Sequence, residues 1–180
     1  MKPGVSRAAV NPMTSLLHPF LWMAVAGFCA SAIVHIASWL GFLPPQLTWA
    51  LHVGIFVVWL PTVIVANKRA GWFPRRDFWR VALQGCPEWV YPAGKVLVGY
   101  TAMNFLIFMY RAGEQGPDKE LIAFRGFSGH WMIFYGAAAG ALYSATRPNQ
   151  SEFHPRCPLG HPVSAAAKFC EQCGSAVVPQ

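Results

Sequence analysis

Charge is scarce in this sequence, and acidic residues are the scarcest. Only 12% of the 180 residues are charged, whereas about 25% are charged in a typical soluble domain. Seven Asp and Glu residues stand against 14 Lys and Arg residues. Because hydrophobic residues make up 54% of the chain, this composition argues against a soluble globular protein and predicts an all-α membrane protein.

Three other features are missing. No unit repeats at the periods of solenoid proteins. The first apolar run is too long for a cleavable signal peptide and follows about 19 residues that include three prolines, so we expect it to stay in the mature chain. No nucleophile, base and acid form a catalytic pattern, and Ser128 and His130 would point to different sides of a helix. The sequence therefore predicts no catalytic residue and favours a non-enzymatic protein.

Long apolar runs dominate residues 20–145. At 1.5 Å per residue, a helix of about 20 residues crosses the roughly 30 Å hydrocarbon core of a bilayer. The predicted spans are residues 20–43, 47–66, 90–110 and 127–145. These runs predict a four-transmembrane-helix bundle, preceded by an N-terminal segment of residues 1–19.

The basic residues set the orientation of the bundle. The connector between the first two spans holds no charge. The connector between the second and third spans holds Lys68, Arg69, Arg75, Arg76 and Arg80. The positive-inside rule places this basic connector in the cytoplasm, so both termini are expected there, in a multi-pass protein of a bacterial inner (plasma) membrane. Residues 74–85 alternate arginines with aromatic residues and predict a helix in the membrane interface.

Cysteine and histidine gather in a tail, residues 154–180, which follows a polar linker at residues 146–153. The tail contains two short motifs, CPLGH and CEQCG. Thiolate sulfur and imidazole nitrogen are the usual ligands of tetrahedral structural zinc sites. The predicted zinc ligands are Cys157, His161, Cys170 and Cys173, with His154 as an alternative. A segment this short rarely folds without metal or disulfides, so metal binding is expected to supply its folding free energy.

A zinc site fits these residues better than a disulfide or an iron site. Disulfides are disfavoured because the cytoplasm keeps thiols reduced and the tail has an odd number of cysteines. A rubredoxin-like iron site would favour four thiolates, whereas this set includes His161.

The stretch CPLGHPVSAAAKFCEQCGSAV resembles the short zinc-ribbon modules appended to many bacterial membrane and regulatory proteins. The resemblance covers about residues 154–178 and departs in the first knuckle, where His161 replaces a second cysteine and follows one residue later. It implies a module that docks to protein or nucleic acid and does not catalyse a reaction. Arg156 and Lys168 are too few to indicate nucleic-acid binding, and Phe169 is expected in the small core of the ribbon. We therefore expect a protein partner.

Polar residues inside the spans form a second candidate site, because ionisable groups are costly in lipid. His35, His52 and His130 are predicted to lie in the outer half of the bundle, at a level similar to that of Asn104. Three hypotheses stay open. These side chains could hydrogen-bond between helices, the histidines could bind haem b, copper or a quinone, or the polar residues could form a path for protons or ions.

Gly136 and Gly140 lie about one helical turn apart, where small residues let another helix approach closely. That helix could belong to the same chain or to a partner. The sequence as a whole predicts an integral membrane accessory or interaction protein with a structural zinc-ribbon docking tail. The alternative function is a small membrane electron carrier. The expected partners are the lipid bilayer and a protein bound to the tail or the glycine face, since the net charge of +7 indicates attraction to anionic lipid and not to nucleic acid.

Overall fold

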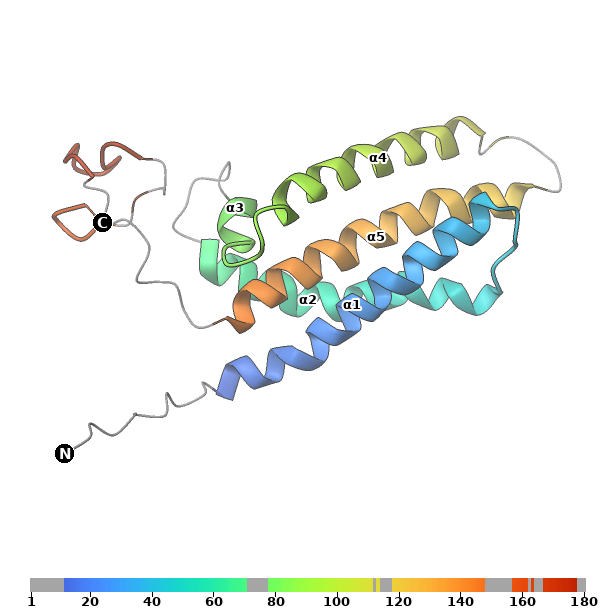
Figure 1. The fold of residues 1–180 in the computed structure, drawn as a ribbon, viewed down its shortest axis with the longest axis horizontal. Coiled ribbons are helices and arrows are strands. Elements are labelled where there is room, and N and C mark those ends of the chain that lie inside the picture. Colours follow the sequence, from blue (N-terminus) through green and yellow to red (C-terminus); the bar gives the residue numbers. More distant parts are fainter. Residues whose placement is uncertain are drawn as a thin grey trace.

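The described part of the chain folds into helices (Figure 1). The computed structural model describes residues 12–70, 78–111, 113, 118–147, 157–161, 163 and 167–177. The helices are α1 (Pro12–Trp39), the 3-10 turn η1 (Gln46–Trp49), α2 (Ala50–Ala70), α3 (Phe78–Ala82), α4 (Val90–Arg111) and α5 (Lys119–Thr146). Four predicted segments lie partly outside the described residues: residues 1–11 of the N-terminal segment, 74–77 of the interfacial helix, 148–153 of the linker, and 154–156, 162, 164–166 and 178–180 of the zinc ribbon.

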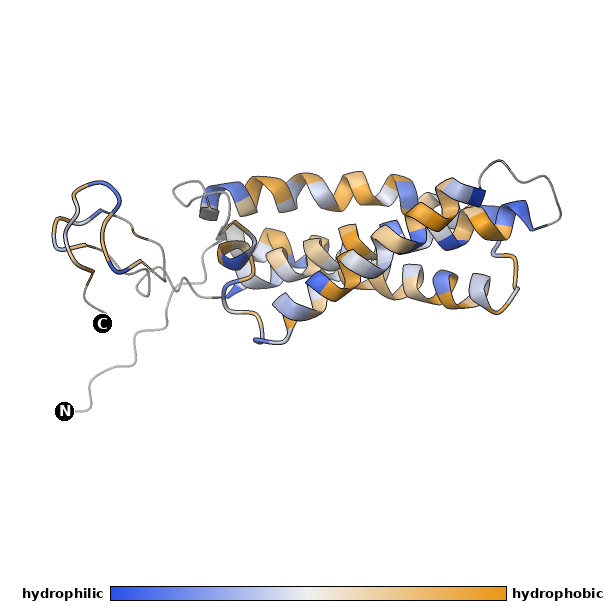
Figure 2. Ribbon diagram, turned by 90° about the horizontal axis from the view of Figure 1, so that it is seen from above, coloured by the Kyte–Doolittle hydropathy of each residue, from blue (hydrophilic) through white to orange (hydrophobic). Residues whose placement is uncertain are grey.

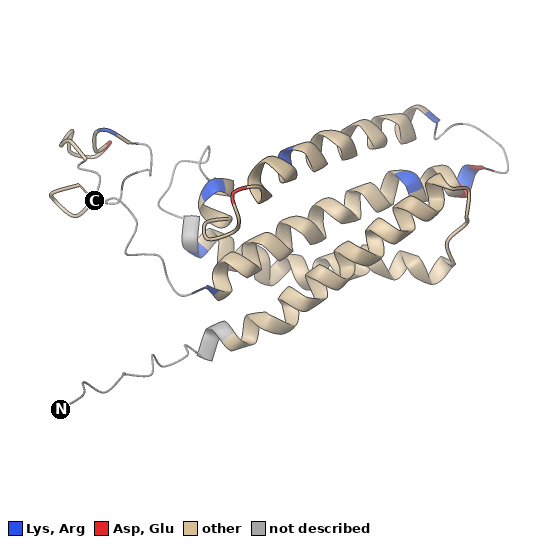
Figure 3. Ribbon diagram, in the orientation of Figure 1, with Lys and Arg blue, Asp and Glu red and all other residues tan. Residues whose placement is uncertain are grey.

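The four long helices form a bundle in which each runs antiparallel to the next along the chain (Figure 1). α1 begins, α2 ends, α4 begins and α5 ends at the same end of the bundle as α3, which we call the α3 end. The opposite end, which we call the Arg125 end, holds the turn from α1 to α2, the end of α4 and the start of α5. Lys and Arg residues gather toward the two ends and leave a long uncharged middle (Figure 3).

Three of the described helices are long and apolar enough to cross a membrane. Their segments are Ser15–Trp39, Gln46–Lys68 and Val90–Arg111. Large apolar side chains such as Ile33, Phe56 and Val96 point outward from them and are at least two-thirds exposed, as expected for surfaces that contact lipid. Hydrophobic residues run along these helices (Figure 2). The chain is therefore a helical membrane protein with three supported spans.

The predicted fourth span, residues 127–145, does form a helix, but among the described helices α5 is not apolar enough to count as a span. The prediction of four spans is supported only for three. α5 contacts α1, α2 and α4, and twelve of its residues are buried, compared with two in α4. A helix surrounded by protein needs small and polar residues for close packing, not a continuous apolar surface. Its central position explains its weaker hydropathy.

The residues of α3 fall within the range predicted for the interfacial helix, residues 74–85, and α3 packs against the bundle. Val81 and Ala82 are buried, and α3 contacts α2 and α5. In the turn that follows α3, the Gln84 carbonyl accepts a hydrogen bond from the Ser144 hydroxyl of α5. Helical structure is therefore seen only at Phe78–Ala82 within the predicted residues 74–85, and a position in the membrane interface stays a prediction.

Gly136 and Gly140 both face side chains of the same chain. A Cβ at Gly136 would lie 3.3 Å from the Phe28 ring, and one at Gly140 would lie 2.6 Å from Leu83 Cδ2. The glycine face is therefore filled by α1 and by the turn after α3. Packing within the chain explains both glycines without a partner.

Tyr135 of α5 packs against a glycine of α1 and a glycine of α2. Its ring lies against Gly27 of α1, and its hydroxyl lies against Gly54 of α2, so that a Cβ at either glycine would overlap with the tyrosine. The hydroxyl donates a 2.9 Å hydrogen bond to the carbonyl oxygen of Leu51. Tyr135 is only 4% exposed. Its ring is packed and its hydroxyl is hydrogen-bonded inside the bundle.

We expect Gly27→Ala to lower the free energy of unfolding by about 1–3 kcal/mol, the range for overpacking a filled site, because the new methyl group displaces the Tyr135 ring. Gly99→Ala is the matched control, since no atom lies within 4 Å of a Cβ built at Gly99. The measurement is thermal unfolding in mild detergent followed by tryptophan fluorescence. Equal effects of the two substitutions would contradict the packing described for Tyr135.

Candidate metal centre and buried polar network

The second cysteine motif forms a tight turn stabilised by its own backbone. The Gly174 amide donates to the Cys170 carbonyl at 2.8 Å, and the Cys170 amide donates to the Ser175 carbonyl at 2.8 Å. Gly174 has φ +69°, a left-handed conformation that glycine adopts without the steric cost of a Cβ. The flanking residues Phe169 and Ala176 form an antiparallel bridge. This turn aims Cys170 and Cys173 in one direction.

The first motif closes in the same way. The Gly160 amide donates to the Cys157 carbonyl at 2.8 Å, and the Cys157 amide donates to the His161 carbonyl at 3.1 Å. Gly160 has φ +80°, so a glycine is again required at the bend. Cys157 and Cys170 are buried together with Val163. The two turns therefore face each other across a small core.

The structure brings together all four residues predicted as metal ligands. Their ligand atoms, three Sγ and the His161 Nδ1, all lie within 4.8 Å of one another. Cys157 Sγ lies 3.6 Å from Cys173 Sγ, and His161 Nδ1 lies 3.5 Å from Cys157 Sγ and 3.7 Å from Cys170 Sγ. Zinc–ligand bonds of about 2.3 Å to sulfur and about 2.0 Å to nitrogen imply tetrahedral edges of about 3.6–3.8 Å. The cluster could hold a metal ion and is compatible with zinc.

The alternative ligand His154 lies outside the described residues. His161 was the ligand that departs from the ribbon pattern, yet its Nδ1 lies within 3.7 Å of two cysteine sulfurs. A Cys3His donor set fills every position of a tetrahedral ion with protein.

The two cysteines of the second turn have pKa values shifted in opposite directions. The hydroxyl and backbone of Ser175 stabilise the Cys173 thiolate and lower the pKa of Cys173 to about 6. The hydroxyl oxygen lies 3.3 Å from Cys173 Sγ. Burial raises the pKa of the Cys170 thiol, because a charged thiolate loses solvation there. At neutral pH Cys173 is therefore ready to bind a cation, whereas a metal ion has to displace a proton from Cys170.

His35 lies at the centre of a hydrogen-bonded network between α1, α4 and α5. Its Nδ1 lies 2.8 Å from the Ser128 hydroxyl, and its Nε2 lies 2.6 Å from the Tyr100 hydroxyl. The Trp39 indole also donates to Nε2, at 3.1 Å. Because Ser128 donates its own proton to the Phe124 carbonyl, its oxygen accepts from a protonated Nδ1. Both ring nitrogens of a neutral His35 are thus used.

His52 and His130 lie together on another side of α5. Their rings are stacked with centroids 6.4 Å apart and planes inclined by 22°. Trp131 donates an indole hydrogen bond of 3.0 Å to His52 Nδ1. The structure therefore groups these two predicted site residues and pairs His35 with other partners. Asn104 donates to the Tyr100 carbonyl at 2.9 Å and is buried, next to the His35 network.

Sequence reasoning missed two parts of these sites. It paired Ser128 with His130 and rejected that pair, whereas the partner of Ser128 is His35, 93 residues away; only helix contacts could reveal this. The prediction that Phe169 lies in the ribbon core is wrong, because Phe169 is 64% exposed. Val163, Ala167 and Val177 fill that core with the ligands.

The double variant Cys170→Ser, Cys173→Ser should lose about one metal ion per chain, because two of the four ligand atoms are removed. The measurement is elemental analysis of the full-length protein purified in mild detergent. Cys29→Ser is the matched control, since Cys29 lies in α1 outside the cluster and its removal should leave the metal content unchanged. Equal metal content in all three proteins would show that the cluster is not the metal site.

The comparisons with known proteins give no further guide to this site. The chain matches no family model, and searches of curated proteins and of solved structures found no significant match. The likeness of the tail to zinc ribbons therefore rests on the Cys3His geometry. The function has to be argued from the metal centre and the membrane helices themselves.

Proposed function

We propose that the chain is an integral membrane accessory protein whose zinc-folded tail docks a protein partner in the cytoplasm. The observation that carries this proposal is the Cys3His cluster, whose four ligand atoms lie within 4.8 Å of one another. Structural zinc sites have four protein ligands, whereas catalytic zinc sites keep a position for water or substrate. The donor set therefore favours a structural role, and we assign no catalytic residue.

The tail also presents apolar side chains to a partner. Leu159 is 67% exposed in the first turn, and Phe169 is 64% exposed beside the second. Neither side chain supports the small core of the tail, which is made by Val163, Ala167 and Val177 with the cysteines. Aromatic residues, including Phe, are enriched at protein interfaces, and a neighbouring exposed Leu adds apolar area to the same surface. Docking explains why the tail leaves them in solvent.

The membrane part would then hold the tail at the inner surface. We propose that α5 crosses the bilayer with the three supported spans as the central helix of a four-helix bundle. Its 28 residues give a length of about 42 Å, which exceeds the roughly 30 Å hydrocarbon core, and its polar residues contact neighbouring helices. The excess of Lys and Arg from the end of α2 to the start of α4 supports a cytoplasmic location for the α3 end and for the tail.

The docking role predicts a difference between two tail variants and a control. Leu159→Ala, Phe169→Ala should keep the metal but lose crosslinking to a protein partner in native membranes, because only the exposed apolar anchors are removed. Cys170→Ser, Cys173→Ser should lose both. Gln172→Ala, an exposed polar change in the same turn, should keep both. Crosslinked products identified by mass spectrometry are the readout, and an identical set from all four proteins would sink the docking proposal.

An electron carrier is a second candidate function, favoured by the stacking of His52 on His130. These two side chains, unlike His35, share one site. Histidine nitrogens ligate haem iron and copper, so the pair could contribute to a cofactor site on the α2–α5 face.

The visible absorption spectrum of the purified protein separates the two candidates. Under the accessory function we expect a colourless protein that contains about one zinc ion per chain. A Soret band that disappears in His52→Ala but persists in His18→Ala would instead support the electron carrier. His18 is a suitable control because it lies near the start of α1, away from the Arg125 end where α2 begins.

A further inference from the structure

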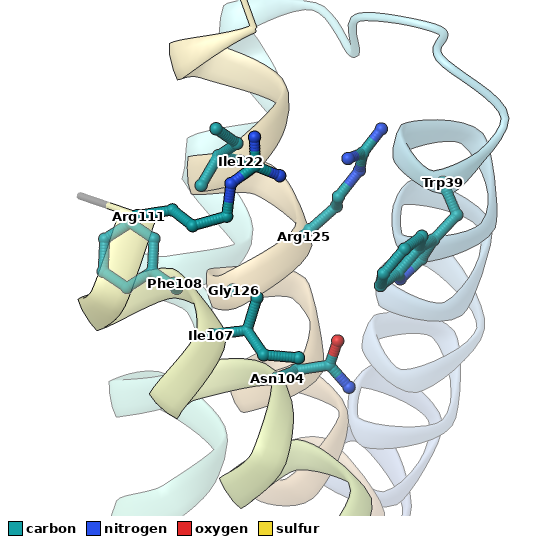
Figure 4. Close-up of a pocket in the computed structure, with 8 residues that line it drawn as sticks. All are labelled: Trp39, Asn104, Ile107, Phe108, Arg111, Ile122, Arg125 and Gly126. Carbon is teal, nitrogen blue, oxygen red and sulfur yellow. The ribbon is translucent and has the colours of Figure 1, made fainter. Parts of the chain in front are cut away.

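A pocket opens at the Arg125 end of the bundle, between α1, α4 and α5 (Figure 4). Its cavity volume is about 50 Å³, which is below the range for pockets that enclose a drug-sized ligand and leaves room only for a small group. Trp39, the last residue of α1, and Arg111, the last residue of α4, both line it. Both helices are supported spans, so the pocket lies where membrane helices end and lipid headgroups begin.

Arg125 is fixed in this pocket by two neighbours on α1. Its Nε donates a 2.9 Å hydrogen bond to the Ser38 carbonyl, and its guanidinium lies 4.9 Å from the centre of the Trp39 ring. Among the described residues, no other nitrogen of Arg125 makes a hydrogen bond. Because the Nε bond and the ring fix the orientation of the fork, its terminal nitrogens are left to bind a ligand.

The other side chains of the pocket add positive charge and polarity. Arg111 extends from α4 toward the same opening, and Asn104 lines the pocket on the side that faces the middle of the bundle (Figure 4). No acidic side chain is among the described residues that line the pocket. Arg125 lies six residues after Lys119, about 9 Å along α5 from the start of the helix. Arg125 is half-buried, and a cation held next to lipid is stabilised by a bound anion.

We propose that this pocket binds a phosphate oxyanion, carried either by an anionic phospholipid headgroup or by inorganic phosphate. Two guanidinium groups from adjacent helices match the bidentate hydrogen bonding that arginine forms with phosphate. The low dielectric beside the hydrocarbon core strengthens that attraction. The site is at the opposite end of the bundle from α3 and is independent of the metal-binding tail.

The proposal is tested on the full-length protein in mild detergent. Native mass spectrometry measures binding of phosphatidylglycerol and of phosphatidylcholine, and thermal unfolding measures the effect of inorganic phosphate. The variants are Arg125→Gln, Arg111→Gln and Arg125→Lys, and the control is Arg80→Gln, an exposed arginine of α3 with the same change in charge. Arg111→Gln keeps the test informative if Arg125→Gln disturbs folding through the lost Ser38 bond.

We expect phosphatidylglycerol to bind in preference to phosphatidylcholine and its affinity to fall roughly tenfold or more in Arg125→Gln and in Arg111→Gln, since each removes a charge-assisted hydrogen bond. Arg125→Lys should lose part of the affinity, and Arg80→Gln none. Stabilisation by inorganic phosphate that requires Arg111 and Arg125, without arginine-dependent lipid binding, would support the same site with a soluble ligand. Lipid and phosphate effects that are both unchanged in the arginine variants would overturn the proposal.

Discussion

The insertion of Tyr135 between Gly27 and Gly54 determines how closely α1 and α2 approach α5. Without a Cβ at these positions, the backbones can approach the ring directly, and the hydroxyl is satisfied by the Leu51 carbonyl. The other interhelical contacts follow from this approach. Two turns along α1 from Gly27, His35 reaches Ser128 of α5 at 2.8 Å. One further turn along, the Ser38 carbonyl reaches Arg125 at 2.9 Å.

The central position of α5 reconciles its polarity with a place in a membrane bundle. Its serines, glycines and arginine face other helices, while the strongly apolar surfaces belong to α1, α2 and α4. In lipid, small residues at helix contacts and hydrogen bonds between helices replace the hydrophobic effect as the source of association. Ser128 and Gly129 illustrate both contributions. The Ser128 hydroxyl hydrogen-bonds His35 of α1, and the carbonyl of Gly129, a small residue at the contact with α4, accepts a 3.3 Å hydrogen bond from the Thr101 hydroxyl. Polar composition here reflects burial by protein.

The sequence predicted the features that depend on local patterns. The Cys and His spacing identified all four residues of the metal cluster, since each turn is closed by bonds over a few residues. The three most apolar helices were found because lipid contact demands continuous hydrophobicity. α5 was harder, because a helix buried by protein carries no such signal. The partners of His35 and the exposure of Phe169 depend on which elements meet, and no single segment contains that information.

The closed turns of the metal-binding tail also bear on how the chain is assembled. Cys157 and His161 are joined by bonds within five residues, and Cys170 and Ser175 by bonds within six. Structures dominated by such short-range contacts form rapidly, since little chain entropy is lost before contacts are gained. The tail can therefore acquire its shape without waiting for the helices to insert and pack. Because the Cys3His cluster could hold a metal ion, the supply of that ion would limit the folding of the tail, whereas folding of the bundle depends on its insertion into the membrane.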